Sequence, residues 1–503
     1  MPDKRIAMVL VVVAAAAGVA QQAEPPPLSA FYDAQSTNDR QAAAALETLR
    51  RSWHDRYTPM IIDMARLLRP ASAAPEGPGL AEVSSLGDGA ESGELGLSSR
   101  RDDFATATRR PPSQESRIRA RLLRFLEQQT GKHFDPQLRS WRTWMWSLPY
   151  DPHPDYAAFK GAVYSRIDRR MTRFFPPGVV SDIRLDEIDW GGVVVNGIPP
   201  LIYPTVIPAD AASYLKDGHV VFGVVVNGQA RAYPKRILAW HEMARDRVGG
   251  VELHVVYCTL CGTVIPYESV AGGRTWRLGT SGLLYRSNKL MFDEETASLW
   301  STLEGRPVVG ELVGRGLQLN SRPVVTTTWG EWRAEHPDTT VLSLDTGHQR
   351  DYAEGAAYRD YFSHDDLYFQ VPGEDRRLRN KAEVLTLRVR ATPGAPPVAV
   401  ALAQDLLKRS RVYPLQVGGR HFVVITSRRG ANRAYATDVS RVAFQATRPD
   451  DRSIVDANGV VWRVTEEQLV PPDPSTPPLP RVPAQRAFWF GWRAQYPDTI
   501  LFK

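Results

Sequence analysis

Residues 251–268, VELHVVYCTLCGTVIPYE, hold the two cysteines of the 503-residue chain, Cys258 and Cys261. The segment before Cys258 is rich in β-branched and aromatic side chains and follows a Gly-Gly pair, which predicts a strand ending at that cysteine. Gly262 tolerates the positive φ that a cysteine loop needs. The segment after Gly262 predicts another strand, whereas the second cysteine of a thioredoxin-type motif opens a helix. The stretch therefore predicts a strand–loop–strand unit that holds two thiols.

The composition indicates a folded, multi-domain protein, because 43% of the residues are hydrophobic and 23% are charged. At the N-terminus, Lys4 and Arg5 precede a short apolar run that ends in small residues, and residues 1–20 therefore predict a secretory signal peptide. The run is shorter than the roughly 20 residues that span a bilayer. We expect a secreted or periplasmic protein, with an uncleaved membrane anchor as the alternative.

Export changes what the cysteine pair means. Outside the cytoplasm a close pair of cysteines exists as a disulfide unless a metal holds it reduced. A disulfide between residues three apart closes a very short loop and adds little stability to a chain of this length. The pair is therefore expected to serve chemistry.

Two helical segments precede the cysteine stretch. Apolar side chains recur at spacings of three and four in residues 21–69 and again in residues 114–178, which predicts amphipathic helices with a break at Pro59. Residues 70–113 are rich in Ala, Gly, Ser, Pro and acidic residues and predict a flexible linker. The sequence TGKHFDPQLRSWRTWMW in the second segment resembles segments that accompany HEAT-type helical repeats. Its tryptophans are expected in the core.

The net charge of +6 is concentrated in the helical part, where residues 100–173 carry an excess of basic side chains. A basic face of this kind can contact an anionic envelope surface. Export makes nucleic acid an unsuitable partner, so none is predicted.

From residue 183 onward, short apolar runs alternate with turn signals such as Asn227-Gly228, which indicates a β-rich region. This region repeats itself: VGGVELHVVYCTLCGTVIPYE is echoed by VGGRHFVVITSRRGANRAYA, and WGEWRAEHPDTTVLS by WFGWRAQYPDTILFK. We expect two copies of one β-rich module, at residues 180–350 and 381–503, with an insertion at residues 351–380. The predicted fold class is α+β multi-domain, with an N-terminal helical domain followed by the two copies.

The second copy serves as an internal control on function. Through the shared VGG we predict that Cys258 corresponds to Thr426 and Cys261 to Arg429. Aligned through the preceding helical segment, His241 and Glu242 fall on Ser410 and Arg411. Because all four reactive groups are missing together from the second copy, we expect them to form one site in the first.

Four motifs in the same order, YCTLCGTVIPYE, GTSGLLYRSNKLMFDEETASLW, AYPKRILAWHEMARDRVGG and TTWGEWRAEHPDTTVLS, resemble the DUF3179 family, a bacterial and archaeal domain of unknown function. Thr259 stands where the family commonly has proline, and Phe292 where it commonly has tyrosine. The resemblance implies that the motif residues belong to the family pattern: Trp240, His241, Glu242, Cys258, Cys261, Ser281, Tyr285, Asn288, Met291, Asp293 and Trp300.

A Cys-x-x-Cys loop supplies two thiolates suited to one tetrahedral metal, so two further ligands are required. His254 shares a strand with Cys258, but four strand residues span about 13 Å, which is too far for two ligands of one ion. We predict His241 and Met291 as the further ligands, in a set that favours copper. An aspartate, Asp293, or water in place of methionine would favour zinc.

Four more residues are predicted to take part in catalysis: Glu242, Ser281, Tyr285 and Asn288. Glu242 would act as a general base, and the others lie in a loop-like stretch suited to binding. Hydrolase, kinase and dehydrogenase fingerprints are absent from the sequence. Three hypotheses stay open: a metal or redox site, a metal-free thiol–disulfide module, and a non-enzymatic envelope scaffold with an inert disulfide.

Overall fold

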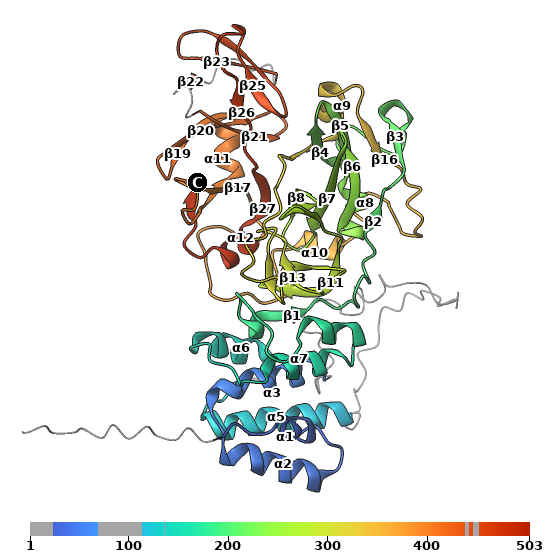
Figure 1. The fold of residues 1–503 in the computed structure, drawn as a ribbon, viewed down its shortest axis with the longest axis vertical. Coiled ribbons are helices and arrows are strands. Elements are labelled where there is room, and N and C mark those ends of the chain that lie inside the picture. The colour runs from blue at the N-terminus through green and yellow to red at the C-terminus, as the bar shows by residue number, and fades with distance from the viewer. Residues whose placement is uncertain (1–23, 69–112, 135, 438–441, 446–451) are drawn as a thin grey trace, which may run out of the picture.

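The computed structural model describes residues 24–68, 113–134, 136–437, 442–445 and 452–503. A layer of helices lies at one end of the molecule, and two β-rich regions stand side by side on top of it (Figure 1). We call residues 180–350 the first β region and residues 381–503 the second. The predicted signal peptide, and the predicted linker except residue 113, lie outside the described residues.

The helical part contains two groups of helices, as the periodicity predicts. Asn38 caps α2 by accepting hydrogen bonds from the backbone N–H groups of the helix's first turn, and Gly131 ends α5 with a φ of 65°. The predicted break at Pro59 is confirmed, because the proline lies in the first turn of a separate helix. Trp141 is fully buried in the helical core. The helices are α1 (Leu28–Asp33), α2 (Asp39–Arg51), α3 (Thr58–Arg66), α5 (Gln114–Thr130), α6 (Leu138–Ser147) and α7 (Tyr156–Tyr164).

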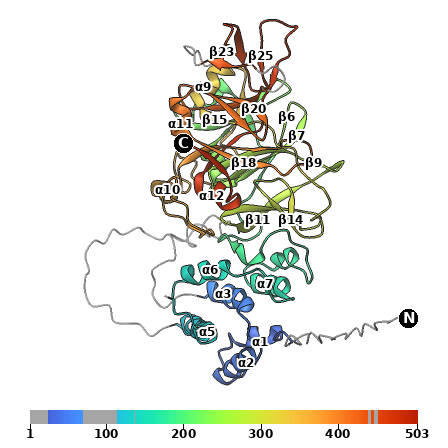
Figure 2. The same cartoon turned by 90° about the vertical axis from the view of Figure 1, so that its left-hand side faces the viewer.

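A buried carboxylate joins the helical part to the first β region. Asp189 lies on β1 (Ile188–Trp190), which pairs with β11 (Leu278–Tyr285). Its two oxygens bind the guanidinium groups of Arg66 and Arg142, at 2.7 and 2.6 Å. Because a buried charge is stable only when it is paired, this contact fixes the helices against the sheet. Figure 2 shows the helical layer below the β-rich regions.

The first β region begins with a sheet of order β15-β4-β5-β16-β3. The hairpin predicted at Asn227-Gly228 is confirmed: both residues have positive φ, and they join β4 to β5. A second sheet, β2-β6-β7-β8, carries the cysteines, and a third, β1-β11-β12-β13-β14, packs on the helices. The strands and helices of this region not bounded above are β2 (Leu201–Ile202), β3 (Val206–Pro208), β4 (Val220–Val226), β5 (Gln229–Pro234), α8 (Lys235–His241), β6 (Met243–Val248), β7 (Val251–Cys258), β8 (Thr263–Glu268), β12 (Asn288–Asp293), β13 (Leu299–Ser301), β14 (Pro307–Val309), β15 (Val325–Thr328), α9 (Trp329–Glu335) and β16 (Thr340–Leu342).

The second β region has sheets of matching order. Its first sheet runs β27-β17-β18-β28, with two antiparallel pairs followed by a parallel one, as in β15-β4-β5-β16. Next in the chain come a helix and a three-stranded antiparallel sheet, β19-β20-β21. Their chain order and strand pairing are the same as those of α8 and β6-β7-β8. A further sheet of the second region runs β22-β23-β24-β25-β26, and the first region also has the short pair β9 (Val270–Ala271) and β10 (Arg274–Thr275). The elements of the second region are β17 (Glu383–Val389), β18 (Val398–Ala403), α11 (Gln404–Arg409), β19 (Val412–Val417), β20 (Arg420–Thr426), β21 (Asn432–Ala436), β22 (Phe444–Gln445), β23 (Ser453–Asp456), β24 (Val461–Val464), β25 (Gln468–Val470), β26 (Leu479–Pro480), β27 (Gln485–Phe488), α12 (Trp489–Gln495) and β28 (Ile500–Phe502).

The strand register corrects the predicted alignment of the two cysteine-loop equivalents by one residue. Val256 pairs with Met243 as Ile425 pairs with Val412, so Cys258 matches Ser427 and not Thr426. The backbone N–H of the third residue after Cys258 returns to its carbonyl, and that of Gly430 returns in the same way to Ser427. Cys261 therefore matches Gly430 and not Arg429. The same match follows from the sequence when it is counted correctly: the tenth residue after Val248 is Cys258 and the tenth after Val417 is Ser427, so the predicted match is one residue short.

Tryptophan contacts recur in the two regions. Trp332 and Trp492 are both fully buried, and each indole N–H donates to a threonine seven residues later at 2.9 Å. Trp300 and Trp462 likewise donate to Asp293 and Asp456, at 3.1 and 3.0 Å. The two regions thus share these two tryptophan contacts.

Each β region covers the loop of the other. In the first direction, the backbone N–H of Phe488 donates to the carbonyl of Cys261 at 2.7 Å, which places the start of α12 on the cysteine loop. In the other, Ala431 of the second region packs in one cluster with Trp329 and Trp332 of α9. Among the described residues, no helix is both long and apolar enough to cross a membrane.

Candidate dithiol site

The cysteine pair lies in a tight turn between two strands, as the sequence predicts. Cys258 is the last residue of β7, and β8 begins at Thr263. Gly262 has a φ of 62°, the left-handed conformation that glycine adopts without strain. Both cysteines are free thiols and have almost no exposed surface, 1% for Cys258 and 0% for Cys261.

The two thiols have opposite electrostatic surroundings. Burial raises the pKa of the Cys258 thiol and so does the charge of Glu242, but hydrogen bonding from the Cys261 thiol and from the backbone N–H groups of Lys289 and Cys261 outweighs both, so the pKa falls below its usual value. Burial, the hydrogen bond to Cys258 and the charge of Cys258 all raise the pKa of Cys261. The Cys261 sulfur also lies 3.2 Å from the carbonyl oxygen of Ser287, a second acceptor for its S–H. Cys258 is therefore the more acidic thiol of the pair.

A buried ion pair adjoins Cys258. Glu242 is the residue after α8, and its carboxylate lies 3.6 Å from the ammonium group of Lys289. Lys289 also donates to the backbone carbonyl of Glu242 at 2.6 Å and to that of Tyr257 at 3.4 Å. Burial lowers the pKa of Lys289, while the charges of Glu242 and Cys258 oppose that effect. The hydroxyl of Tyr358 donates to the other Glu242 oxygen at 3.3 Å.

Aromatic side chains from two distant segments cover the thiols. Cys258 and Cys261 pack in one cluster with Tyr361, Phe488 and Phe490. The Tyr361 hydroxyl donates to the carbonyl of Leu260 at 2.7 Å, inside the cysteine loop. These contacts exclude water from the sulfurs.

Gly491 of α12 leaves room for Cys261. A Cβ at this position would lie 3.0 Å from the Cys261 Cβ and 3.1 Å from its sulfur, closer than ordinary van der Waals contact. Asn288 holds the glycine in place, because its side-chain amide donates to the Gly491 carbonyl at 3.0 Å. The second β region thus completes the surroundings of the cysteines.

Three of the eight described non-glycine residues with positive φ lie beside the pair. Positive φ is uncommon in residues other than glycine, yet Glu242 (54°), Ser287 (65°) and Tyr358 (55°) all adopt it. All three interact with the cysteines or with the ion pair beside them. Such strain costs about 1–3 kcal/mol per residue and persists where the surrounding structure enforces it, often at functional sites.

The structure does not bring the four predicted metal ligands together. Both ring nitrogens of His241 are engaged elsewhere: Nδ1 lies 2.9 Å from the carbonyl of Pro199 and Nε2 lies 2.5 Å from the hydroxyl of Tyr352. Burial lowers the pKa of His241 to about 4, which keeps it neutral. Met291 packs in a different core with Trp300. Asp293, the alternative ligand, is used by the Trp300 indole and neighbouring backbone.

Three predicted catalytic residues have structural partners. Ser281 donates to the carbonyl of Leu290 at 2.6 Å and accepts from the backbone N–H of Leu283, which stabilises an irregularity in β11. Tyr285 has its pKa raised, chiefly by burial and then by Glu187, beside the helical part. Asn288 positions Gly491 beside Cys261. Glu242 alone of the four predicted catalytic residues has its side chain directed at the cysteine site.

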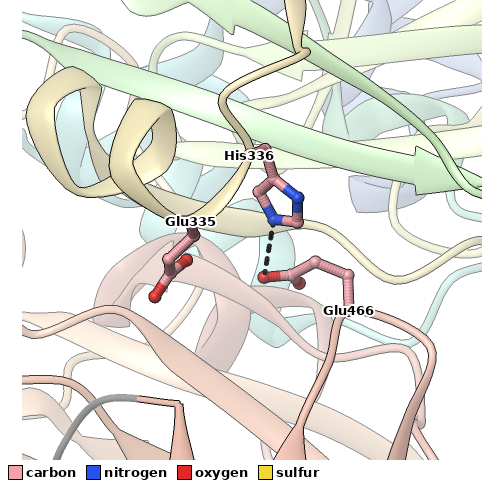
Figure 3. A group of neighbouring side chains, drawn as sticks. All are labelled: Glu335, His336 and Glu466. Atoms are coloured by element: carbon pink, nitrogen blue, oxygen red, sulfur yellow. Dashed lines mark ion pairs between the residues drawn. The ribbon is translucent and has the colours of Figure 1, made fainter.

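A different acidic group has metal-like spacing. Among the described residues, one set of His, Cys, Asp or Glu side chains has ligand atoms within 4.8 Å of one another, and it consists of Glu335, His336 and Glu466 (Figure 3). Arg433 binds both carboxylates at 2.5 Å, and Arg481 also pairs with Glu466. Two guanidinium groups already neutralise these acids, so the group acts as an ionic contact between the two β regions.

Sequence reasoning missed Lys289, Tyr358 and Tyr361. Lys289 belongs to the SNKLMFD motif, and a lysine within an apolar strand is a signal of buried charge. The two tyrosines lie in residues 351–380, for which the sequence predicts only an insertion. The closely spaced aromatics in that segment are the signal of a packed cover.

The comparisons with known proteins place the chain by family. A family model described as "Protein of unknown function (DUF3179)" matches residues 195–499, which is more than half of the chain and includes every residue of the cysteine site described above. The comparisons with curated proteins and with solved structures found no match. The chain belongs to the DUF3179 family.

Proposed function

We propose that this protein is a thiol–disulfide redox protein in which Cys258 is the reactive thiolate and Cys261 the resolving thiol. The observation that carries the proposal is a buried pair of free cysteines in one tight loop, with the Glu242–Lys289 ion pair beside it and a lower pKa at Cys258 than at Cys261. The thiolate is the nucleophile in thiol chemistry, so stabilising it on one cysteine assigns the roles.

The surrounding residues have roles that follow from their contacts. Lys289 and Tyr358 hold the Glu242 carboxylate next to the thiols. The carboxylate can accept protons and the Lys289 ammonium can donate them. When the pair is oxidised, the S–S bond forms, both thiol protons leave, and the oxidant takes up two electrons. Strained backbone at Glu242, Ser287 and Tyr358 supports a site held for chemistry.

A dithiol is favoured over the metal site that the Cys-x-x-Cys spacing suggests. A tetrahedral metal requires two ligands besides the cysteines. His241 is engaged through both nitrogens, and Met291 belongs to another core. Zinc or copper would therefore have to be held by the two sulfurs with help from Glu242, a set with no histidine.

We further infer that the two β regions are copies of one module, of which the second lost the site. The matching strand orders and tryptophan hydrogen bonds support this. Export remains a proposal that rests on the residue pattern of positions 1–20, and contact of the basic helical part with an anionic envelope surface remains a proposal that depends on it.

Alkylation with iodoacetamide tests the redox proposal. In the reduced native protein, Cys258 should react with a midpoint pH below the usual thiol value of about 8.5, and the Cys261→Ser variant should raise that midpoint because a donor to the thiolate is weakened. Ser427→Ala provides the matched control in the second region and should leave the profile unchanged. Elemental analysis of the same protein should find less than stoichiometric metal.

Two results would overturn the redox proposal. One is stoichiometric zinc or copper that is lost in Cys258→Ser. The other is a pair of thiols that react in denaturant but stay inert, in every oxidant tried, in the folded chain.

A further inference from the structure

We propose that the oxidant of the dithiol is a small neutral peroxide, with hydrogen peroxide as the substrate that fits, rather than a protein disulfide. The inference deepens the proposed function and rests on it, because it names the substrate class of the same pair of cysteines. It is carried by how closely the sulfurs are enclosed and by which polar groups reach them.

The enclosure excludes a bulky substrate. Exchange with a protein disulfide requires the attacking sulfur to line up with two sulfurs of the partner, and Cys258 has only 1% of its surface exposed. Phe488 and Phe490 come from the second β region, and Tyr361 from the segment between the regions. Even one added carbon at Gly491 would press on the Cys261 sulfur.

The enclosing segments are also held by polar contacts. The Tyr361 hydroxyl donates to Leu260 in the cysteine loop, and the ammonium group of Lys381 donates to the carbonyls of Tyr361 and His364. The Phe488 backbone is bonded to Cys261 itself. A protein disulfide would have to displace these contacts together, whereas a molecule close to water in size needs only a small local opening.

The polar groups suit the cleavage of an O–O bond. The Cys258 thiolate attacks one peroxide oxygen, the S–O bond forms, and the O–O bond breaks to release hydroxide. The ammonium group of Lys289, which interacts electrostatically with Cys258 and is bonded to the Glu242 carboxylate and two carbonyls, would stabilise the charge that develops on that oxygen. The hydroxide takes the proton of the Cys261 thiol and leaves as water.

The second step closes the disulfide. The Cys261 thiolate attacks the Cys258 sulfenic acid, the S–S bond forms, and hydroxide leaves with the proton that Cys258 had released on ionisation. In sum, one hydrogen peroxide and two thiols give one disulfide and two waters. The two electrons come from the two cysteines, so this half of the cycle needs no other reductant.

The experiment compares oxidants on the full chain after reduction and removal of the reductant under argon. After one equivalent of hydrogen peroxide, the number of titratable thiols per chain should fall from two to zero. Peptide mass mapping should then find a disulfide between Cys258 and Cys261. In Cys261→Ser the same treatment should leave a sulfenic acid on Cys258, which dimedone traps when it is added together with urea so that the enclosing side chains do not hinder it. Cumene hydroperoxide, which is bulky, and oxidised insulin, a protein disulfide, should act at least an order of magnitude more slowly.

The failures are distinguishable. If insulin or cumene hydroperoxide oxidises the pair as fast as hydrogen peroxide does, the substrate class is wrong while the redox function stands. If a dimedone adduct does not form in Cys261→Ser although the pair is oxidised, the peroxide step is wrong. If none of the oxidants reacts with the folded chain, both proposals fall.

Discussion

The loop between β7 and β8 and the loop between β20 and β21 have the same strand frame and opposite chemistry. The first carries Cys258 and Cys261, and the second carries Ser427 and Gly430 at the matching positions. Ser427 keeps a local role, since its hydroxyl accepts the backbone N–H of Ala431 at 3.0 Å. The hairpin therefore folds without sulfur, and the cysteines are retained in the first region for something other than the fold.

The covering helices differ in the same sense. α12 presents Gly491 to the cysteine loop, whereas the aligned residue of α9 is Glu331, which accepts a hydrogen bond from Thr327 at 2.6 Å. Gly491, which has no side chain, faces the loop that contains sulfur. Glu331 occupies the aligned position facing the loop that contains none. Both loops are covered by the other β region, but only the cover of the Cys258 loop leaves space for a thiol.

The largest expected effect tests the packing that the two regions share. Trp332→Ala and Trp492→Ala each remove a fully buried indole and its hydrogen bond, so each should lower the free energy of unfolding by about 3–5 kcal/mol. Urea titration followed by circular dichroism measures both. A loss below about 1 kcal/mol in either variant would show that the two helices do not have equivalent roles.

The next effect is a pH dependence of stability that comes from His241 in the first region and has no counterpart at the aligned residue of the second. Burial holds the pKa of His241 at about 4, whereas the unfolded value is about 6.5, so between these values the unfolded chain binds more protons and stability falls as the pH falls. Above about pH 6.5 His241 is neutral in both the folded and the unfolded chain, so stability no longer depends on its protonation. The loss of stability at low pH amounts to roughly 3 kcal/mol at most, because each tenfold change in proton affinity corresponds to about 1.4 kcal/mol.

Ser410 occupies the matching place in the second region and does not titrate. His241→Gln should therefore show a shallower loss of stability than the native chain between pH 6.5 and 4.5, measured by urea titration at several pH values. Identical pH slopes for the two proteins would contradict the assigned burial of a neutral histidine.

A smaller effect tests the fit to sulfur. Gly491→Ala brings a methyl group against the Cys261 sulfur and should cost about 1–3 kcal/mol by overpacking, while Glu331→Ala in the other helix should cost about 1 kcal/mol for a lost hydrogen bond. Gly491→Ala should also change the rate of thiol alkylation, and Glu331→Ala should not. If both variants left alkylation unchanged, the contact between α12 and the thiols would have no effect on reactivity.

The smallest effect concerns the loop that lost the cysteines. Ser427→Ala removes the acceptor of the Ala431 N–H and should lower stability by about 1 kcal/mol. Hydrogen exchange at Ala431 should rise while exchange around Cys258 stays the same. Faster exchange around Cys258 would mean that the two loops open together.

Most of the fold could be predicted from the sequence. Strand ends at Cys258 and Thr263, the turn at Asn227-Gly228 and the helix break at Pro59 follow from local chemistry: β-branched runs, positive φ and the missing proline N–H. The grouping of the cysteines with Glu242 also follows from the sequence. These features depend on residues close together in the chain.

What escaped prediction depends on distant contacts. His241 is adjacent to Glu242 in sequence, yet its ring is held by Pro199 and Tyr352, which local spacing does not reveal. Gly491 reaches the site from the other β region, bonded to a residue 203 positions away. The match of Cys258 with Ser427, by contrast, needs no distant contact, because the two segments have equal lengths from VGG to the loop.

The cover formed by α12 also has a consequence for the order of folding. Contacts between residues so far apart in sequence form late, because closing a long loop costs entropy before the contact repays it. The hairpin around Cys258 can form early from neighbouring residues, so during folding its thiols stand open to any oxidant or disulfide until the second region docks. The cysteine pair that is buried in the folded protein is therefore exposed for part of the folding process. Whether it is buried as a dithiol or as a disulfide depends on the compartment in which the second region docks.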